Sequence, residues 1–219
     1  MTANSIPNQA NWTSDGGAYN ATEFMVQQLL ARVRTAGLVK VITATSAGGL
    51  APAGTVDVQP MVSAIDGHGV AEPHGQLSSL LYLRVQGGGN AIIIDPAPND
   101  IGMAVFCDRD ISVVKATKAP ATPGSFRRFN MLDGIYFGGM LNGIPTQYLQ
   151  FIGSKLVLNA LTELDLQIGG STVLAATAGG VSITGTLDVS GDAKINGIQF
   201  TPHEHINGGG SGNSGPVAT

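Results

Sequence analysis

Three consecutive hexapeptides with one shared pattern occupy residues 181–198. Residues 181–186 read VSITGT, residues 187–192 read LDVSGD and residues 193–198 read AKINGI, so each is apolar, polar, apolar, polar, glycine and a variable residue. This alternation predicts a short strand that ends at a glycine turn in every hexad. Because alternate side chains of an extended chain lie on one face, stacked hexads align their apolar pairs along an axis. The repeat therefore predicts an elongated β-helix or β-prism.

A looser form of the same alternation extends this region back to about residue 147, as in residues 156–158 and 164–168. One chain of this width has too little two-sided hydrophobicity to enclose a core, whereas three chains wound about a common axis each supply one inward face. Only 12% of the residues are charged, against roughly 25% in an ordinary soluble domain. Residues 147–200 are therefore predicted to form an intertwined homotrimeric shaft.

The N-terminal part, residues 1–37, is predicted as an extended arm followed by a helix over residues 19–36. Val26, Leu29, Leu30 and Val33 recur at helical spacing. Asn20 and Glu23 have the spacing of a capping box, and Gly37 is expected to end the helix.

Residues 38–118 show a period of two in several short runs. These runs lie at residues 38–42, 55–58, 80–85, 91–95, 103–107 and 111–114, and glycine- and proline-containing turns separate them. Five or six short strands predict a small β-barrel of the OB type. Cys107, the only cysteine, is expected to be a buried thiol of this barrel.

Residues 119–146 have a different composition and are predicted as a connector. Arg127 and Arg128 precede Asp133 in this stretch. Two interpretations stay open: ion pairs between neighbouring chains, or a solvated linker whose charges contribute little.

Residues 201–219 are predicted to form an apex. His203 and His205, in the sequence PHEH, project to the same side of an extended chain. Three chains meeting on a threefold axis would bring six imidazole nitrogens to one point, which suits an octahedral ion better than a tetrahedral one. The alternative is two solvated histidines in a polar tail. His68 and His74 lie in a turn-like segment, where we expect a surface loop without chemistry.

Charge and hydropathy argue against several classes of protein. The formal net charge is −4 and the 11 Lys and Arg residues are scattered, so nucleic acid is not an expected partner. No apolar run approaches the roughly 20 residues that span a bilayer, and no signal-peptide pattern begins the chain. We therefore expect synthesis in a cytoplasm and no integral membrane segment.

The order of helix, small barrel, connector, trimeric β-shaft and terminal His-x-His resembles the central spike proteins of contractile-tailed bacteriophages. The motifs that carry the resemblance are residues 99–102 (NDIG), 106–111 (FCDRDI) and 133–136 (DGIY), together with the hexads and residues 202–205. The resemblance implies that the barrel joins the spike to the baseplate hub. It also implies that His203 and His205 of three chains coordinate one iron ion per trimer, as an octahedral six-histidine site.

The expected function is mechanical and not enzymatic: a virion protein at the tip of the tail baseplate that pierces the bacterial outer membrane when the sheath contracts. One alternative is a receptor-binding tail fibre, which is also a trimeric β-shaft but should end in a larger domain. A hexapeptide-repeat acyltransferase is a further alternative. It would need many more hexads and a catalytic histidine within the coil, whereas His203 and His205 follow the hexads.

Overall fold

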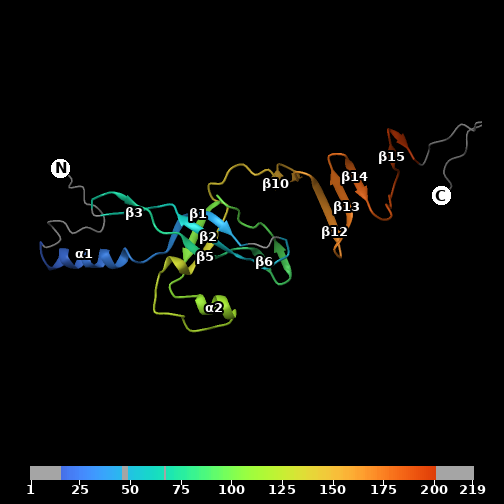
Figure 1. Ribbon diagram of the computed structural model, residues 1–219. Coiled ribbons are helices and arrows are strands. Elements are labelled where there is room, and N and C mark those ends of the chain that lie inside the picture. The colour runs from blue at the N-terminus through green and yellow to red at the C-terminus, as the bar shows by residue number, and fades with distance from the viewer. Residues whose placement is uncertain (1–15, 46–48, 67, 201–219) are drawn as a thin grey trace, which may run out of the picture. The chain divides into compact units, whose positions relative to one another are not determined.

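The chain divides into two compact units, residues 1–143 and 144–219. The computed structural model describes residues 16–45, 49–66 and 68–200 (Figure 1). His203, His205 and the rest of the predicted apex lie outside the described residues. Strands outnumber helices in the described part of both units, which confirms the mainly β fold predicted from the sequence.

The first unit is built around a closed five-stranded barrel with the order β1-β2-β5-β9-β8. Its strands are β1 (Ala36–Ala44), β2 (Thr55–Pro60), β5 (Leu77–Tyr82), β8 (Ile101–Phe106) and β9 (Gly134–Phe137). All neighbours pair antiparallel except β5 and β9, which pair parallel. The small β-barrel predicted from five or six short strands is confirmed, and it has five strands. Its closing strand β9 lies within residues 119–146, beyond the predicted end of the barrel at residue 118.

Alternate residues of the barrel strands fill its interior, as the period of two requires. β1 and β2 each contribute two valines to this interior, and Tyr136 of β9 is 1% exposed. The buried hydrophobic residues are Val39, Val41, Val56, Val58, Leu77, Leu80, Tyr82, Ala104, Phe106 and Tyr136.

The described part of the first unit also contains two hairpins, two helices and a 3₁₀ turn that are not part of the barrel. They are α1 (Ala18–Leu30), β3 (Ala64–Ile65) with β4 (Ala71–Glu72), β6 (Val85–Gly87) with β7 (Asn90–Ile92), α2 (Ser112–Thr117) and the 3₁₀ turn Met131–Asp133. The strand predicted at residues 111–114 is wrong, because α2 occupies this position. Two adjacent valines favour a strand locally. However, the Asp110 carboxylate accepts the N–H of Ser112, and this bond stabilises the first turn of a helix.

Helix α1 is shorter than predicted, and its start differs. Gly17 precedes its first turn and no side chain caps it, so Asn20 and Glu23 lie inside the helix and form no capping box. Gly37, the predicted stop, belongs to β1. No residue of α1 is buried.

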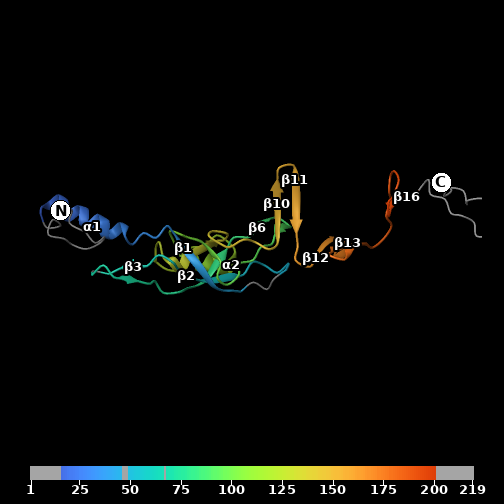
Figure 2. The same cartoon turned by 90° about the horizontal axis from the view of Figure 1, so that it is seen from above.

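The second unit consists of small antiparallel sheets. They are β10 (Tyr148–Ile152) with β11 (Lys155–Asn159), then β12 (Glu163–Ile168) with β13 (Ser171–Thr177) and β14 (Gly180–Ile183), then β15 (Lys194–Ile195) with β16 (Ile198–Gln199). Figure 2 shows β10 and β11 side by side as a long hairpin. The register places apolar residues opposite one another, as in Leu149 with Leu158 and Phe151 with Leu156.

The hexads do not each form one strand in the single chain. The first contributes to β14, the third forms the hairpin β15–β16 with its neighbouring residues, and residues 187–192 form no strand. Asn196 and Gly197 both have positive φ, 50° and 84°, and make the turn of this hairpin. A strand requires a partner strand, and in the single chain residues 187–192 belong to no paired strand.

Candidate functional site

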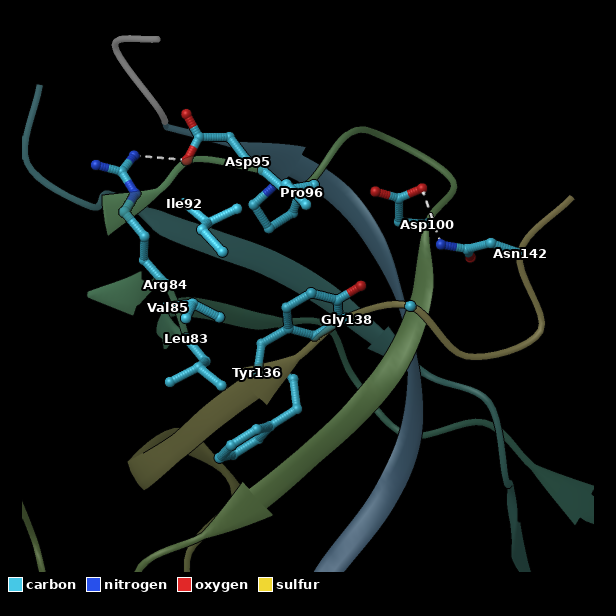
Figure 3. Close-up of a pocket in the computed structure, with 13 residues that line it drawn as sticks. Leu83, Arg84, Val85, Ile92, Asp95, Pro96, Asp100, Tyr136, Gly138 and Asn142 are labelled. Carbon is cyan, nitrogen blue, oxygen red and sulfur yellow. Dashed lines mark hydrogen bonds and ion pairs between the residues drawn. The ribbon is translucent and has the colours of Figure 1, made fainter. Parts of the chain in front are cut away.

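A cavity of about 350 Å³ lies where β9 ends, between residues 83–85, 92–100 and 136–142 (Figure 3). We call it the Tyr136 pocket. Its walls are mostly apolar and include Leu83, Val85 and Ile92, which are all more than half exposed. The pocket was not predicted from the sequence, because three segments that are separate along the chain form it.

Tyr136 stands at the base of this pocket. The side chain is buried, yet its hydroxyl has no hydrogen-bond partner among the described residues. Burial, together with the nearby Asp100 carboxylate, raises the pKa of Tyr136 to about 12, so the phenol is neutral at physiological pH. Gly102 and Gly138 both lie against the ring, and a Cβ atom at either position would contact it. The two glycines thus make room for this aromatic ring.

An ion pair between Arg84 and Asp95 forms another wall of the pocket. Nη2 of Arg84 lies 2.6 Å from Oδ1 of Asp95, and the side chains of Arg84 and Asp95 are 5% and 16% exposed. The hydroxyl of Tyr82 donates to the same carboxylate at 2.7 Å, and Nη1 of Arg84 donates to the Ala51 carbonyl at 2.6 Å. The Asp95 carboxylate raises the pKa of Arg84. The pair fastens the residues around β6 and β7 to the barrel.

Nε of Arg84 is buried and has no acceptor among the described residues. Two buried polar atoms of the residues that line the pocket, Arg84 Nε and the Tyr136 hydroxyl, thus have no hydrogen-bond partner within the described ranges. One sequence signal could have indicated the site: Arg84 is a charged residue inside the apolar run of residues 80–85.

A second ionic network connects the start of α2 to the start of β9. Nε and Nη2 of Arg127 donate to the Asp133 carboxylate at 2.7 and 2.8 Å, and Nη2 also donates to Asp110 at 3.0 Å. The Ser125 hydroxyl donates to Asp110 at 2.7 Å. Hydrogen bonds from Ser112 and Ser125, with the charge of Arg127, lower the pKa of Asp110 to about 2.

This network corrects one sequence-based interpretation of the arginine pair, the solvated linker, for Arg127. Arg127 pairs with Asp110 and Asp133 of its own chain, so it does not belong to a solvated linker, and ion pairs between neighbouring chains stay a prediction for Arg128. Arg128 is exposed and lies over the ring of Phe129, with its guanidinium carbon 5.9 Å from the ring centroid.

Cys107 is only partly buried and lines a cavity of about 620 Å³ beside α2. Burial raises the pKa of its thiol, and the charges of Asp133 and Asp108 act in the same direction. A thiol with a raised pKa is a poor nucleophile, so we assign it no chemistry.

The other histidines lie on the β3–β4 and β4–β5 connections. Nδ1 of His68 is 3.8 Å from the Asp66 carboxylate, and the His68 side chain is 91% exposed. The carbonyl of His74 accepts a hydrogen bond from Gln59. Within the described ranges, no group of three or more His, Cys, Asp or Glu side chains is placed to hold a metal ion.

Comparison with protein-family models and with curated proteins finds no match to this chain. In the part of the chain that the structure describes, no helix is both long and apolar enough to cross a membrane.

Proposed function

We propose that this chain is the central spike of a contractile phage tail, a homotrimeric structural protein of the virion. One observation carries the proposal. Among residues 144–200, all of which the structure describes, none is buried, although apolar side chains line one face of each sheet. In the three-stranded sheet, for example, Leu166 pairs with Leu174 and Leu174 with Ile183. Such a face is too extensive to stay in water, and three copies around one axis would cover it.

The barrel supports the same proposal. Its strand order β1-β2-β5-β9-β8 is that of a closed Greek-key barrel, as expected for an OB-type fold. In a spike, this domain would attach the trimer to the baseplate hub. The residues quoted for the resemblance occupy packed positions in it: Gly102 lies against Tyr136, and Asp110 and Asp133 share Arg127.

His203 and His205 of three chains would bind one iron ion at the apex in this proposal. The donor set suits the role, because neutral imidazole binds iron and other transition metals, and six donors favour octahedral coordination. Structural metal sites in small domains contribute on the order of 10 kcal/mol to folding. Such an ion would tie three strand ends together and so resist fraying of the tip as it pierces the outer membrane.

The test is elemental analysis by mass spectrometry on untagged protein, combined with light scattering for the oligomeric state. We expect a trimer with one iron per three chains. A monomer with exposed apolar sheets would refute the shaft, whereas a metal-free trimer would refute the apex site and favour a receptor-binding fibre.

A variant pair tests the ligands directly. His205→Ala should remove the metal and leave the trimer intact, whereas His68→Ala, which alters an exposed histidine of the β3–β4 connection, should change neither. Metal should also be released as the pH falls through the imidazole range near 6.5, since only neutral histidine is a ligand. Metal retained by the His205→Ala trimer would contradict the assignment.

A further inference from the structure

Phe126 is the most exposed aromatic residue that the structure describes, with a relative accessibility of 102%. Its two neighbours are firmly held. The Ser125 hydroxyl is bonded to Asp110, and the Arg127 guanidinium is bonded to Asp110 and Asp133. The backbone beneath Phe126 is thus fixed while its ring projects into solvent. Rigid aromatic side chains that lie out of the core are typical anchors of protein interfaces.

The Tyr136 pocket is complementary to an exposed aromatic ring in polarity and in size. Its rim is apolar, with Val85 62% and Ile94 79% exposed, and its cavity of about 350 Å³ has room for an aromatic ring. Figure 3 shows the hydroxyl of Tyr136 directed toward Gly138, beneath Pro96 and Asp100. The Tyr136 hydroxyl and Arg84 Nε are buried, so the surface that the pocket presents to an occupant is mostly apolar.

A chain does not fill its own pocket with its own Phe126. No residue between 118 and 133 lines the cavity. Arg127, next to Phe126, is bonded to Asp133 before the start of β9, whereas the pocket includes Tyr136 and Phe137 at the end of this strand. Four residues of strand span about 13 Å at 3.3 Å per residue. A protruding anchor and a recess at opposite ends of one element favour a head-to-tail contact between copies, which closes into a ring when the rotation allows.

Charge favours the same pairing. Asp100 lines the pocket and makes no ion pair among the described residues. Arg128 lies two residues after Phe126, is exposed, and likewise makes no ion pair within the described ranges. A copy that inserts Phe126 therefore brings a cation to the neighbourhood of an acidic recess.

We propose that Phe126 of one copy inserts into the Tyr136 pocket of the neighbouring copy, so that the barrels of the trimer form a closed head-to-tail ring. The inference rests on the homotrimer proposed above and adds to it a specific contact outside the shaft.

The test places the photo-crosslinking amino acid p-benzoylphenylalanine at position 126 of the full chain. After irradiation, we expect covalent dimers and trimers whose adducts map to residues 83–96 or 136–142. The same amino acid at Val70, on the β3–β4 hairpin and 61% exposed, should give no such adduct and serves as the control. Light scattering on the same sample separates the two proposals. A trimer without these adducts, or with adducts elsewhere, overturns the ring alone, whereas a monomer overturns the trimer as well.

A substitution provides an independent measurement. Phe126→Asp should raise amide hydrogen exchange of residues 83–96 in the trimer several-fold, because a carboxylate cannot replace the ring beside Asp100. Phe126→Leu, which keeps an apolar side chain, should leave this exchange within about twofold of the unmodified protein. Equal exchange in the two variants would overturn the contact. Misfolding is not a concern, since the fully exposed ring contributes no packing within its own chain.

Discussion

Gly102 provides a sharp test of the barrel core, because its Cα lies directly against Tyr136. A Cβ at this position would lie 2.5 Å from Cε2 of Tyr136 and would also overlap the carbonyl oxygen of Phe137. Neither group can move easily: the ring is 1% exposed, and the carbonyl belongs to the backbone at the end of β9. Overpacking of a well-packed core typically costs about 1–3 kcal/mol. Since backbone is involved here, we expect Gly102→Ala to destabilise the barrel by at least about 2 kcal/mol.

The matched control is Gly37→Ala, in the neighbouring strand β1. A Cβ at Gly37 has no atom within 4 Å, and its φ is not positive, so this change should be neutral or slightly stabilising. The assay is hydrogen exchange of the β1 and β8 amides, which reports opening of the barrel independently of the second unit. A loss of about 2 kcal/mol raises the opening equilibrium roughly thirtyfold. Equal hydrogen exchange in Gly102→Ala and Gly37→Ala would contradict the close packing of Gly102 against Tyr136.

Three further predictions concern charge and backbone. Arg84→Met leaves the Asp95 carboxylate buried without its cation and should lower the melting temperature by roughly 5–10 °C, whereas Arg109→Met, which removes an exposed pair, should change it by less than about 2 °C. The pKa of Asp110 falls from 3.8 to about 2 on folding, so its contribution to stability is present above about pH 4 and is lost as the pH falls toward 2. The acid unfolding curve of Asp110→Asn should therefore differ from that of the unmodified protein. An unchanged curve would contradict this role of Asp110. Lys118 ends α2 with a φ of 54°, and Lys118→Gly should stabilise the protein by about 0.5–1 kcal/mol in urea unfolding; a loss of stability would argue against this conformation.

The antiparallel barrel strands could be predicted because each carries its own signal. Residues 38–42, 55–58 and 103–107 alternate, and each lies in or overlaps a barrel strand. β9 has only four residues in a glycine-containing stretch, and its pairing with β5 is set by the fold and not by local pattern. α2 contains strand-favouring valines, but the hydrogen bond to Asp110 favours a helical start. A long-range pairing decided β9, and no sequence window includes it, whereas the hydrogen bond that favours α2 joins residues only two apart and was missed as a local signal.

Arg84 stands out in its apolar run, but the shape of the Tyr136 pocket could not be predicted, for a similar reason. Its polar atoms come from Arg84 and Tyr136, which are far apart in sequence, and only the barrel register brings them to one cavity. In the second unit, the alternation of apolar and polar residues correctly predicted that apolar residues of neighbouring strands lie opposite one another. It did not indicate which residues become strands in a single chain, because that depends on hydrogen-bonded neighbours.

The parallel pairing of β5 and β9 has a consequence for synthesis of the chain. Tyr82 pairs with Tyr136, so the barrel cannot close until residues 134–137 have left the ribosome. A nascent chain that ends between residues 118 and 133 presents two open strand edges, on β5 and β8, and such edges readily pair with other chains. Long-range pairing is also slow to form. However, the apolar sheets of residues 144–200 follow β9 in the sequence, so they emerge only once the barrel can close. The most aggregation-prone surface of this protein is thus synthesised only after β9, when the open edges of β5 and β8 can already be paired.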